Sequence, residues 1–262
     1  MGFTLRKIHK TANIVIRKRL RPDLSAGCTC SVRPIDFRLP RVTKTGIAVK
    51  GSQYCLQKHV DNQADQLASQ IMGCAPSLLA FNGDFEWVSP LQAENYKEYR
   101  DDFLDALGLS QFNVAREQFW PKGGPQWDGL AKVKRGDQTA YVLIEAKAHP
   151  GETQSSCSAS PDSLKKIQGS LRATQMHLGV PVKDWTKDYY QTANRLAFLY
   201  FMNVRLDLPT WLAFVNFTDD ETHIPTDLNT FVKHYQTLYH DMGLDRAQML
   251  MDRVITVFTP KI

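Results

Sequence analysis

The sequence contains no long hydrophobic segment. Its longest uninterrupted apolar run, Leu196 to Met202, has seven residues, whereas a membrane-spanning helix needs about 20. We therefore expect no transmembrane helix and no membrane partner. The composition, with 43% hydrophobic and 23% charged residues, is typical of a folded globular chain.

The sequence lacks the cysteine and histidine spacings of disulfide-crosslinked and zinc-binding proteins. The five cysteines include no CxxC pair, which argues against a disulfide framework and against a zinc knuckle. The seven histidines include no pair at i and i+4, so a zinc site on one helix face is not expected. No secretory signal is recognisable either. A reduced, cytoplasmic location is the expected one.

Acidic residues are almost absent from the first 50 positions. This segment holds 12 Lys and Arg but only Asp23 and Asp36, a net charge of +10, whereas the remainder carries -5. Residues 1–52 show no sustained periodicity and contain several prolines, so we interpret them as a basic N-terminal arm. The arm would either face nucleic-acid phosphates or be a solvated tail. Residues 53–262 are interpreted as a single domain.

Hydrophobic periodicity in this domain predicts an α/β fold. Apolar residues at helical or alternating spacing, bounded by Gly, Pro and capping residues, mark the elements. Helices are predicted over residues 53–72, 89–107, 161–178, 189–204 and 230–242. Strands are predicted over residues 111–119, 126–134, 138–148, 210–218 and 254–258.

The common catalytic motifs are missing. The sequence has no GxxxxGK, GxGxxG, HExxH or GxSxG pattern, which argues against P-loop NTPases, dinucleotide-binding enzymes, zincins and α/β-hydrolases. A nucleophilic Cys-His pair formed only in space stays open, although no local pattern favours one.

One group of charged residues stands out in the two central predicted strands. The apolar run Tyr141 to Ile144 predicts a buried strand, and its period of two places Glu145 and Lys147 on one face. A two-residue or four-residue loop at Gly136-Asp137 makes the numbers of paired residues sum to 273. Asp128 would then lie opposite Glu145, with Cβ atoms ~4.5–5.5 Å apart. A three-residue loop would not give this pairing.

Two facing carboxylates repel each other unless a cation lies between them. Hard oxygen ligands select Mg²⁺ or Mn²⁺ over zinc, and a lysine on the same face can stabilise charge that develops on a phosphate. Asp128, Glu145 and Lys147 therefore suit metal-dependent phosphodiester hydrolysis. The alternative is a structural ion-pair cluster at a strand end.

These residues resemble the motif of the PD-(D/E)xK phosphodiesterase superfamily, which includes restriction endonucleases, Holliday-junction resolvases and repair nucleases. The resemblance covers about residues 90–220. It implies a restriction-endonuclease-like core of helix, three-strand meander, helix and strand, with a mixed central sheet flanked by helices. Asp128 and Glu145 match the metal-binding acids, Lys147 matches the catalytic lysine, and Ala146 is included with the metal ligands. Trp127 replaces the proline of the motif. Two longer blocks, EAKAHPGE (145–152) and YYQTANRLAFLYFMN (189–203), are similar to uncharacterised bacterial members.

Many members of this superfamily add an acid from the preceding helix. Glu94, Glu98 and Asp102 are the candidates here, and we choose Glu98 because it borders the apolar stripe at Tyr99. An acidic helix face of this kind is commonly just solvated.

Further polar and aromatic residues could border the site. In related nucleases a polar residue on the helix after the third strand completes the site, and Gln191, Asn194 or Gln168 could do so. They could equally pack between helices. We interpret Trp120, Trp127 and Trp185 as core residues or cleft walls. Cys157 follows the predicted strand that carries Glu145 and Lys147, and it could line the site or have no role there.

The resemblance and the residues together imply an Mg²⁺-dependent nuclease. DNA is expected as the substrate and partner before RNA. The alternative is a non-catalytic nucleic-acid- or protein-binding module on the same fold. The sequence leaves open whether the enzyme acts as an endonuclease or an exonuclease, and which sequence or structure it recognises. It also leaves open the oligomeric state, including a homodimer.

Overall fold

A computed structural model describes residue 43 and residues 46–262 of the chain. Most of the expected basic arm, and with it the arm's role, lies outside the described residues. The helices are α1 (Gly51–Gly73), α2 (Pro76–Phe81), α3 (Phe103–Ala106), α4 (Asn113–Phe119), α5 (Pro161–Leu178), α6 (Tyr190–Tyr200) and α7 (Leu228–Met242). The strands are β1 (Asp84–Ser89), β2 (Gly129–Arg135), β3 (Gln138–Lys147), β4 (Thr210–Thr218) and β5 (Val254–Pro260). Short 3-10 turns and a π-helical turn, Phe201–Arg205, complete the described part.

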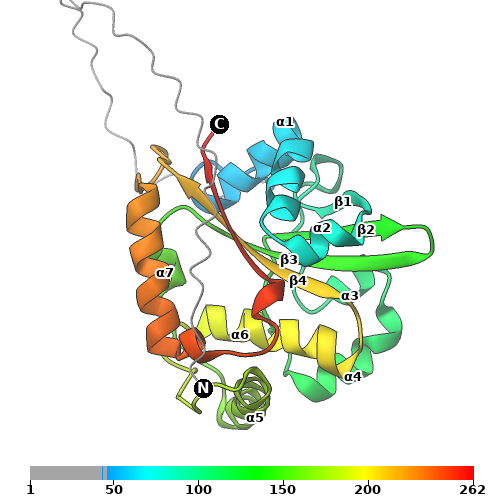
Figure 1. Cartoon of the computed structure of the whole chain (residues 1–262), viewed down its shortest axis with the longest axis vertical. Coiled ribbons are helices and arrows are strands. Elements are labelled where there is room, and N and C mark those ends of the chain that lie inside the picture. Colours follow the sequence, from blue (N-terminus) through cyan, green and yellow to red (C-terminus); the bar gives the residue numbers. More distant parts are fainter. Residues whose placement is uncertain (1–42, 44–45) are drawn as a thin grey trace, which may run out of the picture. The chain divides into compact units, whose positions relative to one another are not determined.

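The five strands form one mixed sheet in the order β1-β2-β3-β4-β5 (Figure 1). β1, β2 and β3 are antiparallel neighbours, whereas β3, β4 and β5 run parallel. β3 and β4, at the centre, are buried along almost their whole length, as strands covered on both faces are. The expected α/β class is confirmed as a five-stranded mixed sheet flanked by helices.

Helices cover both faces of this sheet. α1 and α2 lie on one side, and α5 and α6 lie on the other (Figure 1). The side chains of β3 alternate between the two sides: Val142 and Ile144 pack with the residues of α1, and Leu143 packs with those of α6. Because of this alternation, Glu145 and Lys147 lie on the α6 side of the sheet.

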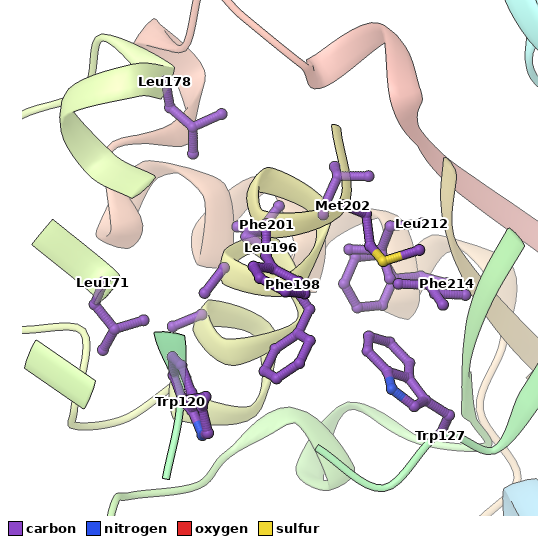
Figure 2. Packing of buried hydrophobic residues seen from close by; sticks show 14 of the residues in the cluster. Trp120, Trp127, Leu171, Leu178, Leu196, Phe198, Phe201, Met202, Leu212 and Phe214 are labelled. Carbon is purple, nitrogen blue, oxygen red and sulfur yellow. The ribbon is translucent and has the colours of Figure 1, made fainter. Parts of the chain in front are cut away.

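The core on the α6 side is dense with aromatic rings. Phe198 of α6, which is 1% exposed, lies between Trp120 and Trp127 (Figure 2). Its ring centroid is 5.5 Å from that of Trp120 and 6.2 Å from that of Trp127, both in edge-on geometry. These contacts hold α6 against the residues that directly follow α4 and against the segment just before β2. They also make the two tryptophans core residues, one of the two roles expected for them.

The helix predicted over residues 89–107 is wrong. Ser89 ends strand β1, and only the four residues of α3 are α-helical in this range. Asn95 and Tyr96 have φ values of +52° and +54°, in the left-handed region that interrupts a right-handed helix. Tyr99 instead forms an antiparallel bridge with Trp127. The apolar residues at helical spacing reach the core from a series of turns.

The strand predicted over residues 111–119 is also wrong. This segment is a 3-10 turn followed by α4, and it buries Arg116 and Phe119, which are spaced as on a helix face. The first strand of the meander is β1, where Phe85 and Trp87 alternate with polar residues. A three-strand meander is therefore present, with a different first strand.

The other predicted elements are confirmed with small changes in their bounds. α1, α5, α6, α7, β4 and β5 occupy the expected ranges. α1 and the residues just before it form one unit, since Ala48 is 1% exposed and its N–H donates to Gln57 Oε1 at 2.8 Å. None of the described helices combines the length and apolar character that membrane crossing requires. Of the described cysteines, Cys55, Cys74 and Cys157 are free thiols.

Candidate active site

A cavity of about 410 Å³ opens where β3 ends and α1 begins. All four catalytic candidates line it, namely Glu98, Asp128, Glu145 and Lys147. The start of α1, the loop after β3, the start of α6 and the loop after β4 supply further lining residues, among them Lys50, Gln53, His149, Glu152, Gln191 and His223. Because β3 and β4 are parallel, their carboxyl ends meet at this edge, where ligands bind in many α/β sheets.

The hairpin of β2 and β3 has the predicted register. Gly129 pairs with Ile144 and Arg135 pairs with Gln138, so a two-residue loop closes the hairpin. Gly136 in this loop has φ +56°, a conformation that glycine adopts without a Cβ clash. Asp128 lies one residue beyond the last pair, and its Oδ2 accepts a hydrogen bond from the Ala146 N–H at 2.7 Å. Asp128 is thus fixed beside the end of β3.

Glu145 is enclosed by two cations. It is 1% exposed, and its Oε1 pairs with the ammonium group of Lys147. Its Oε2 accepts from Arg195 Nε at 2.6 Å. Burial alone would raise the pKa of Glu145, but the charges of Arg195 and Lys147 outweigh burial and the pKa is lowered. Glu145 is therefore ionised at neutral pH.

Arg195 is the site residue that sequence reasoning missed. It lies on α6, is 2% exposed, and also donates to the Gln126 carbonyl at 2.6 Å and to Asn194 Oδ1 at 2.8 Å. Its guanidinium group stacks 4.9 Å from the centre of the Trp127 ring. An arginine inside the apolar segment 193–202 was the available signal, because a buried charge requires a partner.

Glu98 reaches the cavity from an extended segment. The bridge between Tyr99 and Trp127 is antiparallel, and the Trp127 N–H donates to the Tyr99 carbonyl at 2.8 Å. This pairing brings Glu98 next to Asp128, and the side-chain amide of Gln126 donates to the Glu98 carboxylate. Glu98, the acid chosen from the sequence, lines the cavity although the helix predicted to carry it is wrong. Glu94 and Asp102 do not line the cavity.

Two of the three carboxylates resist ionisation. Burial, and then the neighbouring Glu145 carboxylate, raise the pKa of Asp128 well above its usual range. Burial also raises the pKa of Glu98, with a further contribution from Glu145. Both shifts have the direction expected for like charges crowded in a poorly solvated place. A cation among these oxygens would lower both pKa values.

The donor set fits a hard divalent cation. Carboxylates from three separate segments face one cavity, and oxygen donors of this kind suit Mg²⁺ or Mn²⁺. Within the described part of the chain, Asp128 uses only Oδ2 for a hydrogen bond. Glu145 is less available to a metal ion than Asp128, because each of its two carboxylate oxygens already pairs with a cationic side chain. Ala146 could contribute only its carbonyl oxygen, since its N–H donates to Asp128.

The polar candidates from the later helices differ in position. Gln191 lines the cavity, and its N–H donates to Ser155 Oγ at 2.8 Å. Asn194 contacts Arg195 and orients its guanidinium group. Gln168 lies on α5 and lines a different pocket. Cys157 lies outside the residues that line the cavity.

The cavity thus brings together Glu98, Asp128, Glu145 and Lys147, with Arg195 directly behind Glu145. The strand register and the Tyr99 bridge position the carboxylates, and α6 supplies the arginine. Comparisons with known proteins add no relative to this description: no family model, no curated protein and no solved structure matches the chain.

Proposed function

We propose that the chain is a metal-dependent nuclease that hydrolyses phosphodiester bonds in DNA, with RNA as the second substrate class. The observation that carries this proposal is the convergence of Glu98, Asp128, Glu145 and Lys147 on one cavity. Three oxygen-donor side chains and one ammonium group provide ligands for Mg²⁺ or Mn²⁺ and a cation for a phosphate. The fold assignment to the PD-(D/E)xK superfamily belongs to the same proposal.

The order of elements supports the superfamily assignment. α1, the antiparallel strands β1 to β3, helices α5 and α6, and β4 follow each other in the order helix, meander, helix and strand. The described chain differs by placing α3 and α4 between β1 and β2. The matching core would therefore begin at α1, earlier than residue 90.

Each side chain has a distinct role in the proposed reaction. Asp128 and Glu145, assisted by Glu98 and the Ala146 carbonyl, would hold Mg²⁺, which when bound supplies Lewis-acid stabilisation and activates water. Lys147 would stabilise the negative charge that develops on the phosphate, and Arg195 would keep Glu145 ionised and oriented. The amino end of α1, which lines the same cavity, favours an anionic substrate.

One observation favours the alternative function, a non-catalytic binding module. Glu145 already has two cationic partners, as it would in a structural ion-pair cluster on a non-catalytic binding module. In that reading the three carboxylates have no metal to hold. The position of Asp128 and Glu98 at the same cavity supports the metal site, because burial beside Glu145 raises the pKa of both acids and a purely structural cluster gains nothing from two such groups.

A cleavage assay on full-length protein tests the proposal. Single-stranded, double-stranded and branched DNA and the matching RNAs are incubated with Mg²⁺, with Mn²⁺ or with a chelator. The proposal predicts cleavage of at least one substrate that requires the metal. Binding of nucleic acid with no cleavage under any of these conditions would favour the binding-module reading.

A further inference from the structure

A second group of potential metal ligands borders the same cavity. His149 and Glu152 lie in the loop and 3-10 turn (Pro150–Thr153) after β3, and His223 lies in the loop after β4. The parallel pairing of β3 and β4 brings these two loops together at one edge of the sheet. None of the three residues belongs to the carboxylate set of the proposed nuclease site.

The three side chains are close enough to share one ion. Their ligand atoms all lie within 4.8 Å of one another, and all three residues are half-buried. His149 Nε2 is 3.6 Å from Glu152 Oε1, and the rings of His149 and His223 lie edge-on with centroids 5.0 Å apart. Ligand atoms around a tetrahedral ion at ~2.0–2.2 Å are about 3.4 Å apart. A small inward movement of His223 would complete such a site.

The surrounding backbone holds these groups in place. Glu152 Oε2 accepts from the Ala148 N–H at 2.9 Å, and its other oxygen, Oε1, faces His149. Gly151 allows the close approach of the His149 ring, because a Cβ at this position would lie 3.0 Å from His149 Nδ1. Such support of the ligands by backbone groups is common around bound metals.

His223 provides an independent indication of a missing partner. Its Nδ1 is buried and makes no hydrogen bond with any described residue. Asp220 orders its loop, since Asp220 Oδ1 accepts from the Thr222 N–H at 2.9 Å and from the Thr222 hydroxyl at 2.6 Å. Thr222 Oγ1 in turn accepts from the Gly51 N–H at 3.1 Å, which ties the loop to α1. A buried nitrogen without a partner costs stability that a ligand would recover.

We propose that His149, Glu152 and His223 bind a divalent transition-metal ion such as Zn²⁺. Two imidazoles and one carboxylate suit Zn²⁺ and its first-row neighbours, whereas Mg²⁺ prefers oxygen ligands alone. Three protein ligands would leave a fourth coordination position for water or another ligand. The proposal stands independently of nuclease activity, and the ion would be additional to the Mg²⁺ of the carboxylate set.

Metal binding to the full-length protein tests the proposal. Chelator-treated protein is titrated with Zn²⁺ by calorimetry and with Co²⁺ by visible absorption. The site predicts an ion held by nitrogen and oxygen ligands, without the intense charge-transfer band of thiolate ligation. His223→Gln, His149→Gln and Glu152→Gln should each weaken binding at least tenfold, because each removes one of three ligands.

Two controls make the outcome specific. The first control is His240→Gln. His240 also lies 3.6 Å from a carboxylate, that of Asp245, but its side chain is 80% exposed. The His240→Gln protein should bind Zn²⁺ like the unmodified protein. Asp128→Asn should also keep Zn²⁺ binding, which separates this site from the proposed nuclease site. Thermal melting without metal identifies any variant that fails to fold, and Glu152→Gln is the nearly isosteric test. Unchanged Zn²⁺ affinity in folded variants of His149, Glu152 and His223, or ligation of the ion by thiolates alone, would overturn the proposal. His149 and Glu152 would then form a simple ion pair.

Discussion

Arg195 of α6 donates from Nε to Oε2 of Glu145 over 2.6 Å, with exposed fractions of only 2% and 1% for the two residues. This contact connects the helix on one face of the sheet to the end of its central strand. It also keeps a buried carboxylate ionised beside the cavity. The stability of the fold and the charge state of the site therefore depend on the same pair.

Removing the arginine should destabilise the protein strongly. Arg195→Ala leaves Glu145 with Lys147 as its remaining cationic partner in a poorly solvated place, and breaking a buried pair costs about 3–5 kcal/mol. Urea unfolding measures this loss. Lys134→Ala is the matched control, because the Lys134–Glu86 pair is half-exposed and such pairs contribute about 0–1 kcal/mol. Equal effects of the two variants would show that the Arg195 contact is not important for stability.

Alanine substitutions at two glycines should change the stability of the protein in opposite directions. A Cβ at Gly129 would lie 3.2 Å from the Ser89 carbonyl oxygen and 3.3 Å from Ile144 Cβ, and such overpacking costs about 1–3 kcal/mol. A Cβ at Gly169, which is exposed within α5, would meet nothing within 4 Å. Gly169→Ala should stabilise the protein by roughly 0.5–1 kcal/mol through helix propensity. Thermal denaturation of both variants measures whether Gly129→Ala is less stable and Gly169→Ala more stable than the unmodified protein. Unchanged stability of Gly129→Ala would contradict the tight packing beside Asp128.

The pattern of correct and incorrect sequence predictions has a physical explanation. The register of β2 and β3 was predictable because local rules decide it: a two-residue turn at Gly136 and a side-chain period of two. The helix over residues 89–107 was wrong because Tyr96 and Tyr99 reach the core through turns, and a contact with Trp127 across the fold decides the conformation. Local periodicity carries no information about such a contact.

Strand geometry predicts the part of the site that lies on one hairpin, whereas Glu98 is chosen from the family resemblance and a predicted helix that the structure does not have. Asp128, Glu145 and Lys147 lie on the same hairpin, so strand geometry alone brings them together. Arg195 and His223 reach the cavity edge only through the packing of α6 and the parallel pairing of β4 with β3. Neither relationship has a sequence signature at fixed spacing.

Stability should fall in mild acid because of a buried histidine. His59 is 2% exposed and lies next to Phe217, and burial lowers its pKa in the folded protein. The unfolded chain, with a histidine pKa of about 6.5, therefore binds a proton more readily. This contribution to stability is complete above that pKa and is lost as the pH falls below it toward the folded pKa.

The variant His59→Asn isolates this effect. Asparagine can keep a hydrogen bond to the Cys55 carbonyl, which lies 2.8 Å from His59 Nδ1, but it does not titrate. The free energy of unfolding should therefore fall less between pH 7.5 and pH 5 in this variant than in the unmodified protein. His240→Asn, at an exposed position, should retain the original pH dependence. Identical pH profiles for all three proteins would rule out His59 as the source.

Cleavage by four proteins in parallel is the measurement that tests the central claim most directly. The unmodified protein is compared with Asp128→Asn, Glu145→Gln and Lys147→Ala, with and without Mg²⁺, while the melting temperature is recorded for each sample. Because these variants remove two ligand charges and the cation near the phosphate, each should lower the cleavage rate by about two orders of magnitude or more. The two carboxylate variants should also lose the Mg²⁺-dependent rise in melting temperature, whereas Lys147→Ala should keep it. Unchanged cleavage in Asp128→Asn, or an unmodified protein that neither responds to Mg²⁺ nor cuts any substrate, would contradict the account.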